Sequence, residues 1–246
     1  MLALKALPPD CSGRAVRNDC QTCDARLFSV CAALQGDDLR RLGALAEKLE
    51  LEAGESLIHE GDPARHVFNI TSGSVRVFKL LPDGRRQITG FLFAGDFLGL
   101  AAGDGYVFSA EAIEPAGVCR FRKTDYRALV RDCPSLETAL LDRAQHELAA
   151  AQNQMLLLGR KTALERLASF LLDLPRHDPA RAAEPDVVRL PMTRAEIADY
   201  LGLTIETVSR VLTRLKTQGV IRMAALNELR ILQPGVLRSL AQVEGG

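Results

Sequence analysis

The sequence predicts an α+β protein built from an antiparallel β-roll, a long helix and a winged helix-turn-helix. Short strands punctuated by glycines between residues 51 and 121 predict the roll. Apolar residues at alternating steps of three and four predict the long helix, and two short amphipathic helices joined by a glycine predict the helix-turn-helix. We therefore expect four parts: an arm (1–35), the roll (36–133), the long helix (134–159) and the winged unit (160–246).

Length and composition bound the class of protein. A chain of 246 residues favours two domains, and 47% hydrophobic with 25% charged residues indicates a globular protein. It has no run of about 18 apolar residues, and Pro8 and Pro9 break its opening segment, so we expect a cytoplasmic protein without membrane contact. The formal net charge is zero, so any nucleic-acid-binding surface must be local. We find no catalytic triad or phosphate-binding loop that would indicate an enzyme.

The arm is rich in cysteine. Cys11, Cys20, Cys23 and Cys31 all fall within the first 31 residues. In a reducing cytosol such a cluster indicates metal or redox chemistry before disulfide bonding. Because the arm has little apolar periodicity, we expect the group bound by its thiolates to order it, and mobility without that group.

The roll begins with a short amphipathic helix that Asp37 or Asp38 is expected to cap. Further on, Val75 and Val77 occupy alternate positions, as in a half-buried strand. Pro82-Asp83-Gly84 predicts a hairpin turn, because proline presets φ and glycine supplies the positive φ that follows. The apolar face of the short helix comprises Leu39, Leu42, Leu45, Ala46 and Leu49.

The long helix carries a heptad seam, which we expect to pair with a second copy of the chain. The alternative is that this helix packs on its own roll. A second helix is expected from residue 161 to 174, ending before Pro175, and a loop from 175 to 185. The seam comprises Leu141, Ala144, Leu148, Ala151, Met155 and Leu158.

The helix-turn-helix starts at a capping box, Thr193-Arg194-Ala195-Glu196, and Gly202 ends its first helix. Thr204 then caps a second helix, and residues 220–232 predict a two-stranded wing. The inward face of the first helix is Ile197, Ala198 and Leu201, and that of the second is Val208, Val211, Leu212 and Leu215.

The opposite face of the second helix is polar and comprises Glu206, Ser209, Arg210 and Thr213. Such a stripe is usually only a solvated face, but the second helix of a helix-turn-helix lies in the major groove of DNA. Arg210 can donate a bidentate pair to guanine, Glu206 can accept from cytosine, and Ser209 can serve either role. Arg214 and Lys216 would then lie toward phosphates.

The segment 202–210, GLTIETVSR, and the motif Gly95-Asp96-Phe97-Leu98-Gly99 resemble the CRP/FNR superfamily of bacterial transcription regulators. The resemblance covers about residues 20 to 235. It implies a cyclic-nucleotide-binding-like roll, a homodimer, and mainly activation of promoters through RNA polymerase. It also implies that the polar stripe reads a palindromic, double-stranded DNA operator with TTGAT-type half-sites. The expected DNA-binding set is Thr204, Glu206, Ser209, Arg210, Thr213 and Arg214.

Members of this superfamily differ in effector. Cyclic-nucleotide binders carry a glutamate and an Arg-Ser pair where this chain has Leu100 and Phe108-Ser109. Without a cation a buried phosphate would stay unpaired, so a cyclic nucleotide is disfavoured. His59 and His66 are expected at the surface rather than as haem ligands.

The cysteines remain as the sensor. Iron–sulfur clusters are commonly held by four thiolates, and Cys20 and Cys23 form a close C-x₂-C pair that Cys31 follows. Zinc is the rival metal, since C-x₂-C also binds zinc. A zinc-bound or metal-free regulator would be constitutive or respond to another effector. The fourth ligand must come from Cys11, Cys119 or Cys133.

The segment Gly117–Phe121 resembles the strand that supplies the distal ligand in oxygen-sensing FNR-type proteins, which favours Cys119. A buried cysteine is also an ordinary core residue, so a packing role for Cys119 is the alternative. The resemblance implies one oxygen-labile [4Fe-4S] cluster per subunit. Because Ala149-Ala150-Ala151 puts no acidic residue at the middle of the seam, dimers could persist in air with altered geometry.

Overall fold

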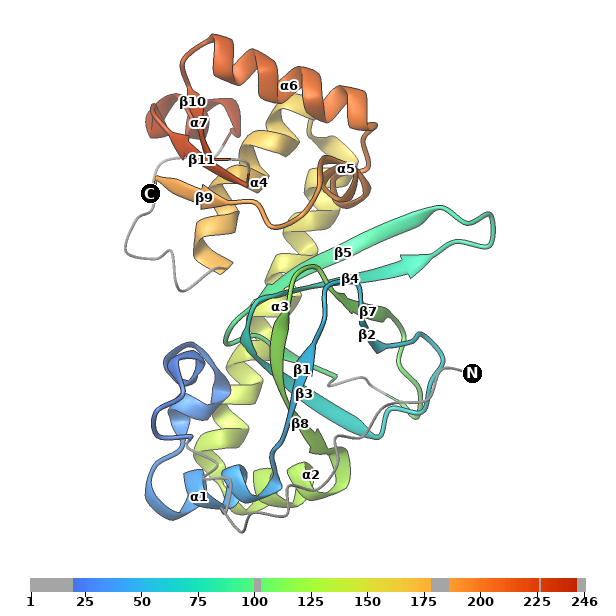
Figure 1. Cartoon of the computed structure of the whole chain (residues 1–246), viewed down its shortest axis with the longest axis vertical. Helices are drawn as coiled ribbons and strands as arrows, with labels where there is room; N and C mark the ends of the chain where they lie inside the picture. Colours follow the sequence, from blue (N-terminus) through green and yellow to red (C-terminus); the bar gives the residue numbers. More distant parts are fainter. Residues whose placement is uncertain (1–19, 100–102, 178–185, 226, 243–246) are drawn as a thin grey trace.

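The computed structural model in Figure 1 describes residues 20–99, 103–177, 186–225 and 227–242. Cys11, Leu100 and most of the expected loop after Pro175 lie outside the described residues. Within them, no helix is both long enough and apolar enough to cross a bilayer.

The roll consists of two antiparallel four-stranded sheets, as predicted. One sheet has the order β1-β8-β3-β6 and the other β2-β7-β4-β5. Alternate side chains of the two sheets meet in an apolar core, in which Ile70, Val75 and Ala110 are fully buried. The strands are β1 (Glu47–Leu51), β2 (Ser56–Ile58), β3 (His66–Ser72), β4 (Ser74–Leu80), β5 (Arg86–Phe93), β6 (Phe97–Leu98), β7 (Ser109–Ala112) and β8 (Ala116–Arg122).

The predicted hairpin joins β4 and β5 and extends from the roll beneath α5 (Arg194–Leu201) in Figure 1. Gly84 has a φ of 84°, which glycine adopts without a steric penalty. The Leu81 amide donates to the Arg85 carbonyl at 2.8 Å and closes the turn. The turn prediction is therefore confirmed.

The cysteine arm forms two short 3₁₀ helices, η1 (Asp24–Phe28) and η2 (Val30–Ala33). Val30 and Leu34 are buried in a core shared with the start of α3 (Pro134–Arg160) and with α1 (Gly36–Leu45). The arm also crosses close to the roll, because a Cβ at Gly95 would meet Phe28 at 2.8 Å. Apolar contacts thus accompany the thiols in residues 24–34, and the expected mobility of the arm without a thiolate-bound group stays a prediction.

Several predicted boundaries were wrong. Gln35 occupies the N-cap position of α1 without a side-chain cap hydrogen bond. Asp37 and Asp38 lie in the first turn, where their carboxylates interact favourably with the helix dipole. Leu49 belongs to β1 instead of to the helix face, because the chain turns into the sheet after Ala46. The helix α4 (Ala163–His177) continues through Pro175, where its packed apolar face outweighs the lost backbone donor.

Besides the two 3₁₀ helices of the arm, three elements were not predicted: α2 (Lys123–Asp132), β9 (Val187–Arg189) and α7 (Pro234–Leu240). β9 adds a third strand to the wing, which has the order β10-β11-β9 rather than two strands. β9 and α7 are short, so their periodicity is weak, whereas α2 is as long as the predicted α1 and its buried Tyr126 and Leu129 were a signal that was missed. The other wing strands are β10 (Ile221–Ala225) and β11 (Glu228–Ile231).

The middle of α3 presents its seam to solvent in the single chain. Leu141, Leu148 and Met155 are 59%, 62% and 66% exposed. The buried apolar residues of α3 lie towards its ends, Leu136 and Leu140 on the arm and roll and Leu157 on the C-terminal unit. The alternative that the whole seam packs on its own roll is therefore wrong, and this face remains available to a second copy.

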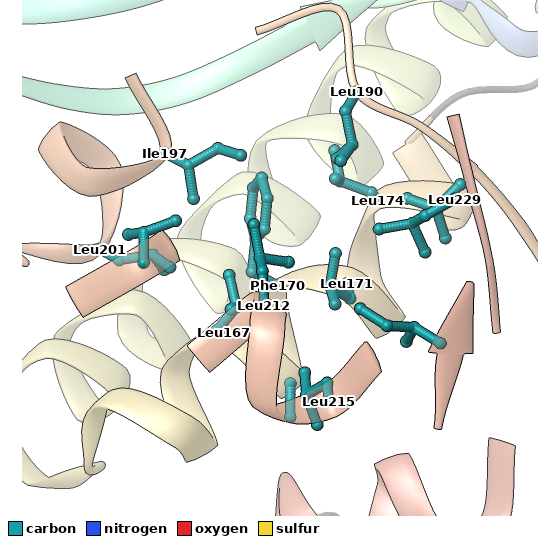
Figure 2. Packing of buried hydrophobic residues seen from close by; sticks show 14 of the residues in the cluster. Leu167, Phe170, Leu171, Leu174, Leu190, Ile197, Leu201, Leu212, Leu215 and Leu229 are labelled. Atoms are coloured by element: carbon teal, nitrogen blue, oxygen red, sulfur yellow. The ribbon is translucent and has the colours of Figure 1, made fainter. Parts of the chain in front are cut away.

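The winged unit is built around one apolar core, shown in Figure 2. Leu171 of α4, Leu201 of α5 and Leu215 of α6 (Ile205–Thr217) are fully buried in it. Phe91 of the roll strand β5 belongs to the same core and lies 5.3 Å from the Tyr200 ring, centroid to centroid. The roll and the winged unit therefore share packed side chains.

Removal of the arm's main apolar anchor tests its packing. Leu34→Ala should lower the free energy of unfolding of the metal-free protein by about 2–5 kcal/mol, because Leu34 is 1% exposed. Urea denaturation followed by circular dichroism measures the change. Leu27→Ala is the control, since Leu27 is 76% exposed and its loss should cost less than about 0.5 kcal/mol. Equal midpoints for the two variants would contradict the packing described for the arm.

Candidate thiolate site and nucleic-acid interface

Cys119 lies at the centre of a sheet. β8 pairs with β1 on one side and β3 on the other, which places Lys48 and Asn69 opposite Cys119. Its side chain is 9% exposed and belongs to the core that also holds Val30 and Leu136. Because β8 is paired on both sides, the Cys119 sulfur is held in a fixed position in the roll.

The arm brings three more thiols to this place. Cys20 and Cys31 pack against the core that contains Cys119, and the charges of Cys20, Cys23 and Cys31 all raise the pKa of Cys119. Ser29 fixes the position of Cys31, because its Oγ accepts from the Cys31 amide at 3.2 Å. The structure thus brings together the four predicted cluster ligands from an arm and a strand far apart in the sequence; their ligand role stays a prediction.

Burial opposes the ionisation of two of these thiols. Burial, with the neighbouring thiols as lesser causes, raises the pKa of Cys119 to about 12. Burial also raises the pKa of Cys31. Several thiolates would repel one another here unless positive charge balanced them, and metals bind cysteine as the thiolate. The donor set therefore fits a thiolate-bound, positively charged group.

The two candidate groups need different arrangements of sulfur. In the part of the chain that the structure describes, no three or more His, Cys, Asp or Glu side chains are placed to hold a single metal ion. A zinc ion needs every sulfur about 2.3 Å from one centre. A multi-iron cluster distributes its thiolates over several irons, so its ligands stand farther apart.

Cys133 lies in the same apolar core as Cys119, but none of the other thiols influences its pKa. It precedes α3, is buried, and lies 4.0 Å from Arg41 Nη1. Burial and the nearby Asp38 raise its pKa. Of the possible fourth ligands within the described residues, Cys119 is the one placed with the arm thiols.

The thiol site is connected to α3 by two short routes. η2 packs directly on α3, through the core that contains Val30 and Leu136. β3 pairs with β6 through Asn69 and Phe97, and the adjacent Asp96 forms an ion pair with Arg143 of α3. A change at the thiols can therefore alter how α3 is held.

The second helix of the helix-turn-helix, α6, has the predicted buried and polar faces, and we call it the reading helix. Thr204 Oγ1 accepts from the Thr207 amide at 3.2 Å and caps α6. Val208 and Leu215 are fully buried, whereas Glu206 and Arg210 are exposed. The side chains that point outward from α6 are Glu206, Arg210, Thr213 and Arg214, with Ser209 half-buried beside them.

Local hydrogen bonds fix the charge of Glu206 and orient the polar side chains of α6. The Glu206 backbone N–H and the Thr204 hydroxyl lower the pKa of the Glu206 carboxyl, so it stays an ionised acceptor. Arg210 Nη2 donates to Thr207 Oγ1 at 3.3 Å, and Arg194 Nη1 lies 3.5 Å from Ser209 Oγ. These contacts are exposed and weak, so the side chains can exchange them for base edges.

Sequence reasoning missed a polar contact between the roll and the winged unit. The capping box at Thr193 is confirmed, and its Glu196 also accepts from Arg76 of β4 at 2.6 Å. Arg86 of β5 forms a second ion pair, at 2.8 Å, with Asp199 of α5. Arg76 gave only the signal of a polar residue between two valines, which does not reveal a partner in another domain.

Comparisons with known proteins agree with this architecture. Residues 165–240 match the family model of the Crp-like helix-turn-helix domain, and residues 48–133 match that of the cyclic nucleotide-binding domain. The nitrogen fixation regulation protein FixK of Bradyrhizobium diazoefficiens is 40% identical over 90% of this chain and 93% of its own. The transcriptional activatory protein AadR of Rhodopseudomonas palustris is also 40% identical, with the same coverage. The solved structure of FixK2 from Bradyrhizobium japonicum has a TM-score of 0.75 and 37% identity over 81% of this chain and 99% of its own.

The raised pKa of Cys119 predicts a pH dependence of stability. The folded state keeps this proton up to about pH 12, whereas an unfolded cysteine loses it near pH ~8.5. The protonated Cys119 therefore contributes fully to the free energy of unfolding below about pH 8.5. This contribution is lost as the pH rises towards the pKa of Cys119 in the folded protein. We expect the free energy of unfolding of the metal-free protein to fall by up to about 1.4 kcal/mol per pH unit above pH ~9.

Urea denaturation at pH 7.5, 9 and 10 measures this fall. Cys119→Ala is the matched variant and should show a smaller dependence on pH, because it has lost the group that titrates. An identical slope in the variant and the wild type would show that the Cys119 proton is not responsible.

Proposed function

Because the chain belongs to the CRP/FNR family of DNA-binding transcription regulators, we propose that it activates transcription when oxygen is scarce, through one [4Fe-4S] cluster per subunit. The relatives' names describe regulators of transcription rather than enzymes, and they name no cofactor. The cluster, its sensitivity to oxygen and the cytoplasmic location belong to the proposal.

One observation carries the proposal. Three half-buried arm thiols lie beside the buried strand thiol Cys119, and burial raises the pKa of Cys31 and of Cys119. When bound there, an iron–sulfur cluster would supply an oxygen-sensitive link between the four thiolates. Cys20, Cys23 and Cys31 would hold the arm to the roll, and Cys119 would anchor it in the sheet.

The chain's own contacts would pass this state to the dimer helix. With the arm held, Val30 and Leu34 stay in the core that also receives Leu136 of α3. The ion pair of Asp96 with Arg143 fixes the same helix to the edge of the roll. Release of the arm would remove one of these two supports and shift the pairing of α3 with its copy.

Pairing of α3 would position the two reading helices. The exposed seam around Leu148 supplies the apolar surface for a homodimer. Two copies of α6 would then lie about 34–36 Å apart, one turn of DNA, which suits a palindromic operator. Glu206, Ser209 and Arg210 would read TTGAT-type half-sites, and the bound dimer would contact RNA polymerase to activate the promoter.

Anaerobic metal analysis tests the proposed cofactor. The wild-type protein purified without oxygen should be brown and contain about four irons and four sulfides per chain. Cys119→Ala should lose most of both and bind the operator more weakly, because the arm loses its anchor in the sheet. Cys133→Ala is the control, since none of the other thiols influences the pKa of Cys133, and it should keep its iron. A colourless wild-type protein with one zinc per chain would contradict the oxygen-sensing proposal and favour a constitutive regulator.

Two arginines of α6 separate base reading from phosphate contact. Arg210→Ala should cost about 1–3 kcal/mol of specific binding and relax selectivity at one guanine. Arg214→Ala should weaken binding to all sequences alike and reduce the salt dependence by about one counterion. Fluorescence anisotropy with operator and random duplexes at several salt concentrations distinguishes the two effects. The same loss on both duplexes for both variants would contradict these roles.

A further inference from the structure

Two buried polar side chains at the core against which Cys31 packs have hydrogen-bonding atoms without a partner in the described part of the chain. Asn69 is 3% exposed, and its Oδ1 accepts no hydrogen bond in the described part of the chain. Tyr126 is 2% exposed, and its hydroxyl likewise has no partner there. Buried polar atoms are nearly always bonded in proteins, so two exceptions at one place call for an explanation.

Asn69 faces the thiols because of its position in β3. Side chains alternate along a strand, and Phe68 and Ile70 point into the core of the roll, while Val67 lies in the core that contains Cys119. Asn69 is paired with Cys119 across β3 and β8. Its Nδ2 donates to Cys31 Sγ at 3.9 Å. An apolar side chain at this position would pack in the same core without any unpaired atom.

Tyr126 reaches the same place from α2. Its ring lies between Phe97 and Phe121, with centroids 5.4 Å from each. Tyr126 belongs to the core that contains Cys119 and against which Cys31 packs. A phenylalanine would give the same ring contacts, so packing does not account for the hydroxyl.

We propose that Asn69 and Tyr126 are positioning residues that donate hydrogen bonds to the sulfur atoms of the thiolate-bound group. A metal-bound thiolate or inorganic sulfide has no proton to donate, so its polar neighbours must present N–H or O–H groups. The amide supplies Nδ2 and the phenol supplies its O–H, while the unpaired Oδ1 is the cost of placing an amide there. Hydrogen bonds to sulfur fix ligand orientation and tune iron–sulfur groups. This inference rests on the proposed function.

A purely structural role makes the opposite prediction. If Asn69 and Tyr126 served only the fold, their apolar replacements would destabilise the metal-free protein and leave iron retention unchanged. If they serve the bound group, Asn69→Leu and Tyr126→Phe should not destabilise the metal-free protein, because each removes an unpaired buried atom. The same variants should hold iron less well.

Iron retention and stability are measured side by side. Wild type, Asn69→Leu and Tyr126→Phe are reconstituted with iron and sulfide without oxygen, and iron loss to an excess of chelator is followed under the same atmosphere. We expect iron loss to be about 10-fold to 100-fold faster in each variant. Urea denaturation of the metal-free proteins should give midpoints equal to or above that of the wild type.

Ser74→Ala is the matched control for a buried polar side chain. Ser74 begins β4, which lies in the other sheet from Asn69, and it is fully buried. Its hydroxyl donates to the Glu114 carboxylate at 2.9 Å. This variant should be less stable than the wild type and retain iron normally. Normal iron retention by both Asn69→Leu and Tyr126→Phe would overturn the inference while leaving the proposed function intact. A wild type that takes up no iron would overturn both.

Discussion

The burial of Cys119 between two paired strands is the constraint on which the rest of the site depends. Its sulfur lies in an apolar core, where ionisation is opposed and the pKa rises to about 12. The arm nevertheless folds three further thiols onto this place, held by the buried side chains of Val30 and Leu34. Apolar packing thus gathers groups whose ionised forms would repel one another, and the cation of the proposed group would balance their charge.

The roll that contains Cys119 contacts both the α3 helix and the winged unit. The core around Cys119 includes Leu136 of the dimer helix, and Asp96 holds Arg143 of that helix. On the other side of the roll, β4 and β5 contact α5 through Arg76 and Glu196 and share the apolar core of the winged unit. A regulator must be able to break and re-form contacts between its domains. The ion pairs that join the roll to α3 and to α5 are contacts of this kind.

Local features of the sequence predicted much of the fold. The turn at Gly84, the capping box at Thr193 and the two faces of α6 depend on residues within a few positions of each other, and all were confirmed. The errors arose where a tertiary contact outweighed a local signal. Pro175 did not end α4, and Leu49 left the helical pattern for a strand.

The sequence by itself determined the cysteine spacing, the seam of the long helix and the chemistry of the reading face, because short-range periodicity records which side of an element is polar. Only the tertiary structure decided that Cys119 rather than Cys133 joins the arm thiols, that Asn69 faces them, and that Arg76 meets Glu196, 120 residues away. Such pairings follow from strand register and from the packing of cores. Neither is written into any short segment, since each depends on how distant segments share one buried volume.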